Sequence, residues 1–175
     1  MRSEGCIVLI CASTGLAAQN YAGDGVTAHH LFNIPVIEEE LKDIGGEPVI
    51  CMLDHIPDRL ELVLASSVII WDEFLSCDRE CFESIFHAPF PNQLRDKIII
   101  TCSDPKQIHS VGQDKEDVLN RTMFSSPLWE RFSKLSLEIN MRLHNPLLTM
   151  DERELQSKYA DMIECIGRNE ACSGD

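Results

Sequence analysis

Three short apolar runs, rich in β-branched residues, constrain the fold of this chain more than any other feature. They cover residues 6–11, 67–71 and 97–102, and each has the length of a buried strand. Stretches with helical periodicity lie between them, at residues 59–65 and 78–87. Strands that alternate with helices favour a parallel sheet, because parallel strands need crossover connections and are buried on both faces. The sequence therefore predicts a three-layer α/β domain with a mostly parallel sheet.

Weaker patterns extend this series towards the C-terminus. An alternating apolar run over residues 134–139 predicts a fourth strand, and residues 127–132 predict a short helix before it. The last helix has the clearest start, because Thr149 and Glu152 have the spacing of a capping box. Apolar residues then recur at helical spacing up to Gly167, where we expect the helix to end.

The chain is expected to form one domain. It has no internal repeat, no low-complexity tract and no linker long enough to separate two domains. We expect this domain over residues 1–167 and a frayed tail over residues 168–175. No apolar run reaches the roughly 18 residues that a membrane span needs, so no membrane association is expected.

The charge of the chain limits how it can bind nucleic acid. Its 175 residues include 15 basic and 29 acidic side chains, a formal net charge of −14. This opposes a broad basic footprint, so any contact with DNA must be local. Residues 36–62 alone hold eight acidic and two basic residues, a net −6. We interpret them as a solvated insertion, with an acidic docking surface such as Glu38, Glu39 and Glu40 as the alternative.

The eight cysteines favour a reducing compartment. None forms a Cys-x-x-Cys pair, and Cys6, Cys11 and Cys102 lie in or beside apolar runs, where a reduced cysteine packs as a small hydrophobe. Cys77 and Cys81 would share a helix face, but no histidine pair with metal-ligand spacing accompanies them. Ordinary packing is therefore the interpretation favoured over a metal site.

Polar residues follow every predicted strand, at the edge where parallel sheets bind ligands. They are Ser13, Thr14 and Gly15 after the first strand, Asp72 and Glu73 after the second, Gln107 after the third and Arg142 after the fourth. A carboxylate can hold Mg²⁺, a second carboxylate can activate water, an amide can sense a phosphate and a guanidinium can bind one. Together these side-chain types favour phosphate chemistry. Each residue taken alone would also fit an ordinary turn or an exposed strand end.

The ordered set of motifs resembles Pif-one-type ATP-dependent DNA helicases, members of the RecD-like superfamily 1 that include the helicases of Helitron-type transposons. The resemblance spans roughly residues 6–165. It rests on Ser13-Thr-Gly-Leu-Ala-Ala18, Gly25-x-Thr27-x-His29, Ile69-Ile-Trp-Asp-Glu73, Asp104-x-x-Gln107 and Asn140-Met-Arg-Leu143. It implies a RecA-like P-loop NTPase fold and ATP hydrolysis coupled to movement along single-stranded DNA and duplex unwinding. It further implies roles in DNA repair, recombination and telomere maintenance, and a nuclear location.

The resemblance also implies site roles for individual residues. Asp72 would hold Mg²⁺, Glu73 would activate the hydrolytic water, and Gln107 and Arg142 would act on the γ-phosphate of ATP. Contacts to the single-stranded DNA backbone would come from Ser13, Thr14, Gly15, Thr27 and His29. Packing within a loop or helix is the alternative for His29.

The chain departs from the family pattern in two ways. It contains no Gly-x-x-x-x-Gly-Lys-Ser/Thr loop, and none of its six lysines follows a glycine. We therefore expect an incomplete first motor domain, without the P-loop strand and without the second motor domain. Ser103 stands where the family usually has glycine, and residues 106–111 lack the usual proline-rich continuation.

Two alternatives to a working helicase segment remain open from the sequence. The first is a helicase remnant that hydrolyses nothing and acts as an interaction domain, which the net charge of −14 favours. The second is an unrelated α/β enzyme that uses a cysteine or the Asp72–Glu73 pair. No recognisable arrangement of cysteine, histidine and acid supports this second alternative.

Overall fold

The computed structural model describes residues 2–36, 49–87, 94, 96–105, 107 and 114–168. The chain divides into two compact units, Met1–Phe132 and Ser133–Asp175. This division falls inside the single domain expected over residues 1–167, and the expected tail lies, from residue 169 on, outside the described residues. The predicted domain boundaries stay a prediction, and each unit is described by itself.

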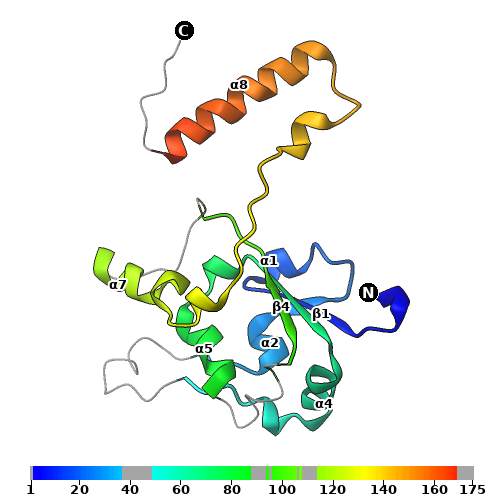
Figure 1. Ribbon diagram of the computed structural model, residues 1–175, viewed down its shortest axis with the longest axis vertical. Helices are drawn as coiled ribbons and strands as arrows, with labels where there is room; N and C mark the ends of the chain where they lie inside the picture. The colour runs from blue at the N-terminus through cyan, green and yellow to red at the C-terminus, as the bar shows by residue number, and fades with distance from the viewer. Residues whose placement is uncertain are drawn as a thin grey trace. The chain divides into compact units, whose positions relative to one another are not determined.

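A four-stranded parallel sheet forms the centre of the first unit (Figure 1). Its strands lie in the order β2-β1-β3-β4. They are β1 (Val8–Ala12), β2 (Gly25–Thr27), β3 (Val68–Asp72) and β4 (Ile98–Thr101). All three pairings are parallel, which confirms the predicted α/β class and the three predicted apolar strands. The three-residue β2 was not expected, because it has no apolar run of its own.

Short helices surround the sheet in the first unit. The α-helices are α1 (Gly15–Ala18), α2 (Ala28–Phe32), α4 (Pro57–Ala65), α5 (Arg79–His87) and α7 (Lys115–Arg121). The 3-10 helices are η1 (Arg2–Glu4), η2 (Leu53–His55), η3 (Phe74–Ser76), η4 (Met123–Ser125) and η5 (Trp129–Arg131). Both helices expected between the apolar strands are present, as α4 and α5.

The main core lies on one face of the sheet. Cys11, Ile69 and Trp71 are at most 1% exposed there, since alternate residues of β1 and β3 face the same side. Helix α5 contributes Phe82 and Ile85 to the same cluster. Burial of these apolar side chains is the main stabilising contribution to this unit.

The opposite face has a smaller cluster. Ala12 at the end of β1 is fully buried against Ala17 and Ala18 of α1. The small side chains let α1 pack close to the strand, so the polar turn before α1 stays at the sheet edge. Towards β4 this face is less covered, because Ile98 is 56% and Ile100 is 38% exposed.

The predicted strand over residues 134–139 is wrong. These residues belong to the second unit, have no regular structure, and expose Leu135 and Leu137 almost completely. An alternating pattern shows only that a segment could lie half-buried in a sheet, and a strand also needs a neighbour to pair with. The helix expected over residues 127–132 is present only as the single 3-10 turn η5.

In the described part of the second unit, residues 133–168, there is one α-helix. This is α8 (Met150–Gly167), which follows the 3-10 helix η6 (Met141–His144). The predicted capping box is confirmed: the Thr149 side chain accepts a hydrogen bond from the Glu152 backbone, and the Glu152 carboxylate accepts one from the Thr149 backbone. Local sequence sets this boundary, because both partners lie within one turn.

Replacing Gly25 with alanine should destabilise the first unit. An added Cβ would lie 2.4 Å from the Ala18 carbonyl oxygen and 2.9 Å from the Tyr21 Cβ, so the backbone around β2 would have to move. We expect a loss of about 1–3 kcal/mol, as for overpacking in a core. Urea denaturation followed by circular dichroism measures it.

The matched control is Gly15→Ala at the start of α1. A Cβ there meets nothing within 4 Å, and alanine favours a helix over glycine by roughly 0.5–1 kcal/mol. This variant should be neutral or slightly stabilised. Equal stability of the two variants would contradict the close approach at Gly25.

Candidate functional site

The segments that follow three strands meet at one edge of the sheet. The Ser13 backbone N–H donates to the Asp72 carbonyl oxygen at 3.1 Å, which joins the segment after β1 to the end of β3. The Phe74 N–H donates to the Cys102 carbonyl oxygen at 3.0 Å, which joins the segment after β3 to the one after β4. The segments that follow three of the four expected strands therefore meet at this edge.

Asp72 ends β3 and is held by a tyrosine from the connection between α1 and β2. The Tyr21 hydroxyl donates a hydrogen bond of 2.8 Å to Oδ2 of Asp72. This bond, together with burial and the negative charges of Asp72 and Glu73, raises the pKa of Tyr21 to about 12. The phenol therefore stays protonated near neutral pH and orients the carboxylate.

Glu73 occupies an unusual backbone conformation. Its φ of 51° and ψ of 38° lie in the left-handed region, which glutamate rarely adopts. This turn ends β3 and begins η3, whose Leu75 N–H donates a hydrogen bond to the Ser103 hydroxyl oxygen at 3.2 Å. A strained residue at the end of a central strand is a common feature of functional sites.

The Tyr21–Asp72 bond should be visible in an alkaline titration. The chain has two tyrosines, and we expect one phenolate absorbance step near pH 12 that is missing in Tyr21→Phe. Since the folded pKa of Tyr21 is raised, its contribution to stability is complete below about pH 10 and is lost as the pH rises towards 12. Asp72→Asn should move the step towards pH 10, and an unchanged step would contradict the bond.

The residues expected to contact DNA have structural partners in the first unit. The Trp71 indole N–H donates to the Ser13 hydroxyl at 3.0 Å. The Thr14 hydroxyl caps α1 at the Ala17 N–H, and the Thr27 hydroxyl caps α2 at the His30 N–H, both at 3.2 Å.

Two further residues complete this set. Gly15 is exposed as the first residue of α1. His29 lies half-buried on α2 with its Nε2 3.7 Å from the Cys81 sulfur. A hydroxyl oxygen that already accepts one hydrogen bond can still donate its proton, so these contacts leave Ser13, Thr14 and Thr27 able to bind a phosphate.

The other two predicted site residues, Gln107 and Arg142, lie in different units of the chain. Gln107 follows β4, is exposed, and donates its backbone N–H to the Asp104 carbonyl oxygen at 3.1 Å. Arg142 lies in η6 of the second unit, where its N–H donates to the Asn140 side chain at 3.2 Å. Because the expected fourth strand is absent, the sheet does not bring Arg142 to the edge that holds Asp72.

The donor atoms at the sheet edge are those that suit magnesium. Carboxylate and hydroxyl oxygens dominate it, and Mg²⁺ binds proteins through one or two carboxylates together with phosphates and water. Among the described residues no group of three or more histidine, cysteine or acidic side chains could enclose a metal ion. The carboxylate and hydroxyl oxygens at this edge fit an Mg²⁺ ion that is bound together with a phosphate.

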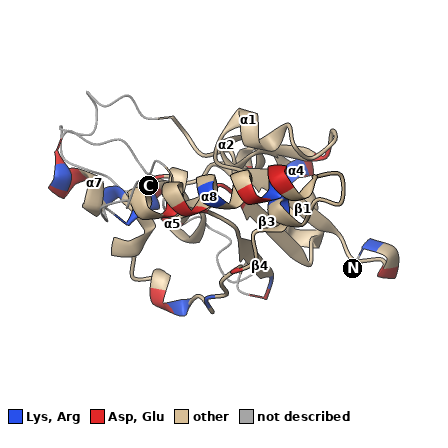
Figure 2. Ribbon diagram, turned by 90° about the horizontal axis from the view of Figure 1, so that it is seen from above, with Lys and Arg blue, Asp and Glu red and all other residues tan. Residues whose placement is uncertain are grey.

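Charged residues of both signs lie on the described helices α4 and α8. Figure 2 shows acidic and basic residues interspersed on α4 and α8, without a continuous basic stripe on either helix. The acidic residues Glu38, Glu39 and Glu40, expected as the alternative docking surface, lie outside the described residues. In the part of the chain that the structure describes, no helix has the length and apolar character needed to cross a membrane.

Sequence reasoning missed Tyr21 as a site residue. Tyr21 and Asp72 are 51 positions apart, and a lone tyrosine in a loop has no motif that links it to a distant carboxylate. The only indication in the sequence was the position of Tyr21 after the first predicted strand. It lies there between the Ser13–Ala18 and Gly25–His29 motifs.

Comparisons with known proteins give a consistent result. A family model described as PIF1-like helicase matches residues 1–173. A crystal structure of Pif1 helicase from Bacteroides, in complex with ADP-AlF3 and ssDNA, is 19% identical with a TM-score of 0.61, covering 95% of this chain and 37% of that one. The Pif1 helicase from Candida albicans is 20% identical with a TM-score of 0.58, covering 91% and 33%. No curated protein matches significantly. The chain thus spans less than half the length of these structures, whose similarity shows a shared fold.

Proposed function

The chain belongs to the PIF1-like helicase family, and on this basis we propose that it forms part of the motor of an ATP-dependent DNA helicase. Within that motor, this chain would bind Mg²⁺-bound ATP at the carboxyl edge of its sheet. The matched structures extend well beyond the length of this chain. Duplex unwinding would therefore belong to a longer polypeptide that includes these residues.

One observation carries the proposal: the adjacent carboxylates Asp72 and Glu73 end the central strand β3, which has a paired strand on either side. Successive residues at a strand end point in different directions, so the two carboxylates can serve two tasks. The left-handed backbone of Glu73 turns the chain sharply at this point.

Asp72 is the proposed ligand of magnesium. Its Oδ2 accepts from Tyr21, which leaves the second carboxylate oxygen as the one available to a cation. When bound, Mg²⁺ would neutralise charge on the β- and γ-phosphates of ATP. Tyr21 acts here as a positioning residue, since its hydroxyl fixes the orientation of the Asp72 side chain.

Glu73 is proposed as the general base that orients and deprotonates the water attacking the γ-phosphate. Gln107 would respond to the presence of that phosphate through its amide, which both donates and accepts. Arg142 would stabilise negative charge with its guanidinium.

Single-stranded DNA is the proposed nucleic-acid partner. Ser13, Thr14 and Gly15 follow β1, while Thr27 and His29 lie where β2 leads into α2. β1 and β2 are paired, with Ala12 opposite Thr27, so both segments leave the same edge of the sheet. Contacts from hydroxyls and backbone groups position a phosphate backbone without reading its sequence.

The test of this proposal is ATP hydrolysis by the longest natural product that contains these residues. Its intact mass is measured first, and the coding sequence is searched for a Gly-x-x-x-x-Gly-Lys-Ser/Thr loop. We expect a mass well above 19.8 kDa and ATP turnover that single-stranded DNA stimulates. A natural product of about the mass of this chain, without such turnover, would favour the inactive interaction domain instead.

We also propose a nuclear location and roles in DNA repair, recombination and telomere maintenance, on family membership alone. Fluorescence microscopy of the tagged natural protein tests the location. Exclusion from the nucleus would contradict it.

A further inference from the structure

A pair of cysteines and a histidine form a cluster that the proposed ATP chemistry does not use. The Cys81 sulfur, on α5, lies 3.7 Å from Nε2 of His29 on α2. Cys77 comes four residues before Cys81, and the two side chains shift each other's pKa. Cys77 lies between η3 and α5, so three elements meet at this cluster.

The two sulfur atoms differ in their access to solvent. Cys81 is partly exposed, whereas Cys77 is only 4% exposed and belongs to the main core. An attacking reagent therefore reaches Cys81 first. Cys77, four residues earlier in the chain and packed in the core, is protected from direct attack.

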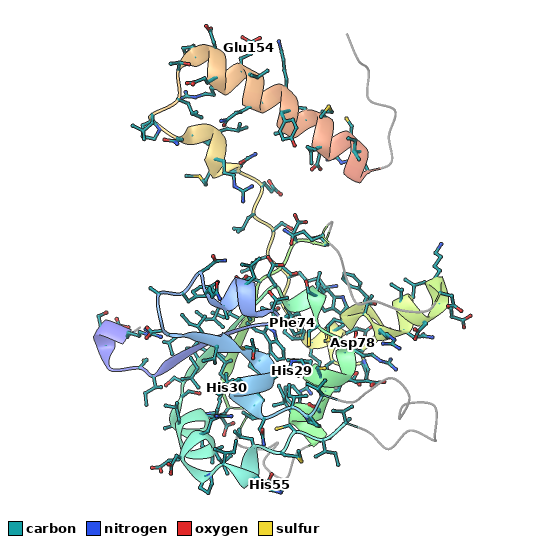
Figure 3. All side chains as sticks on the ribbon, turned by 180° about the vertical axis from the view of Figure 1, so that it is seen from behind. His29, His30, His55, Phe74, Asp78 and Glu154 are labelled. Carbon is teal, nitrogen blue, oxygen red and sulfur yellow. The ribbon has the colours of Figure 1, made fainter. Side chains whose placement is uncertain are left out.

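The surroundings favour a thiolate on Cys81. Hydrogen bonds from Cys77 and then from His29 lower the pKa of Cys81, against the opposing effects of burial and of the Asp78 charge. Its place as the third residue of α5 adds the favourable field of a helix N-terminus. The hydrogen bond to Cys81 in turn raises the pKa of His29, with Asp78 acting in the same direction. Figure 3 labels His29 and Asp78 on the neighbouring segments.

The same contacts act oppositely on Cys77. Its hydrogen bond to Cys81 and its burial raise its pKa well above the usual value, so Cys77 stays a thiol. A thiolate beside a protonated, shielded thiol is the arrangement found where one cysteine reacts and the other resolves the product.

We propose that Cys77 and Cys81 form a peroxide-sensitive redox site, with Cys81 as the reacting cysteine, Cys77 as the resolving cysteine and His29 as the positioning residue. In the first step the Cys81 thiolate attacks a hydroperoxide, the O–O bond breaks, and Cys81 becomes a sulfenic acid as hydroxide or alkoxide leaves. In the second step the Cys77 sulfur attacks the Cys81 sulfur, an S–S bond forms, and water leaves. The two thiols lose two electrons in total, and the hydroperoxide is reduced.

The fold offers an internal comparison for the reactivity of Cys81. Cys102 is more exposed, but burial of part of its side chain and the Asp72 charge raise its pKa. If exposure alone decided reactivity, Cys102 would react first. If thiolate content decides it, Cys81 reacts first, because an ordinary thiol with a pKa near 8.5 is only about 1% thiolate at pH 6.5.

The first experiment is limited alkylation of the reduced chain with iodoacetamide near pH 6.5, followed by peptide mass spectrometry. We expect Cys81 to react at least about tenfold faster than Cys102. His29→Gln should reduce this difference, and His30→Gln, at the neighbouring exposed position, should leave it unchanged. Alkylation of Cys102 ahead of Cys81 in the wild-type chain would overturn the proposal.

The second experiment treats the chain with hydrogen peroxide and maps its disulfides. The wild type should lose about 2 Da and yield a Cys77–Cys81 crosslink, and Cys102→Ser should do the same. Cys77→Ala should instead leave a sulfenic acid on Cys81 that dimedone captures. Circular dichroism checks that this variant folds. If it does not fold, the disulfide map of the wild-type chain alone tests the proposal. A wild-type map in which both cysteines stay reduced while Cys102 is oxidised would contradict the proposal.

Discussion

Replacing Glu73 with glutamine should lower ATP turnover by at least about a hundredfold, as expected when a general base is lost. The variant is made in the longest natural protein that contains this chain, with single-stranded DNA present. Nucleotide binding should stay nearly unchanged, because glutamine keeps the length of the side chain and the proposed magnesium ligand is the neighbouring Asp72. Steady-state turnover and nucleotide affinity, measured on the same preparation, separate the two effects.

The control for this variant is Glu61→Gln. Glu61 is an exposed glutamate on α4, so its loss of charge should leave turnover within error of the wild type. Glu73→Gly adds a second comparison, since glycine adopts the left-handed conformation of residue 73 without strain but supplies no carboxylate. Turnover in Glu73→Gln equal to the wild type would exclude Glu73 as the base.

Replacing Trp71 with alanine should unfold the first unit or bring its melting temperature close to ambient. Trp71 is 1% exposed, and its ring lies 5.8 Å from Phe32, 5.4 Å from Phe74 and 5.7 Å from Phe82 between centroids. Removing such a side chain costs about 3–5 kcal/mol. This is a large part of the roughly 5–15 kcal/mol that stabilises a typical domain. Thermal unfolding followed by far-ultraviolet circular dichroism measures the loss.

Two variants separate the parts of the Trp71 effect. Trp71→Phe keeps an aromatic ring in the core but loses the hydrogen bond from the indole N–H to the Ser13 hydroxyl, so we expect a smaller loss of about 1–2 kcal/mol. Trp129→Ala removes the other tryptophan, which is only partly buried beside the main core, and should cost less than Trp71→Ala. A Trp129 variant as unstable as the Trp71 variant would contradict the central position given to Trp71.

The expected strand at residues 134–139 shows why alternation alone is a weaker signal than a continuous apolar run. The three confirmed strands, β1, β3 and β4, pair with one another in the sheet. The alternating run instead exposes Leu137 fully, since an alternating segment becomes a strand only if a partner is available. Because this strand does not form, the inference that its end carries Arg142 to the site also fails.

The sequence by itself determined the elements that depend on neighbours along the chain. These include the apolar strands, the capping box at Thr149, and the carboxylate pair Asp72–Glu73 at the end of β3. Since parallel strands end at a common edge, the sequence also indicated that Asp72 and the Ser13 turn would meet there.

Only the tertiary structure decided the contacts between residues far apart in sequence. Tyr21 bonds to Asp72 across 51 positions, His29 meets Cys81 across 52, and the Trp71 indole reaches Ser13 across 58. Each depends on the register of the sheet and on which helix covers which face, and residue spacing encodes neither. The proposed magnesium ligand could therefore be inferred from the sequence, whereas the tyrosine that orients it and the reactive cysteine could not.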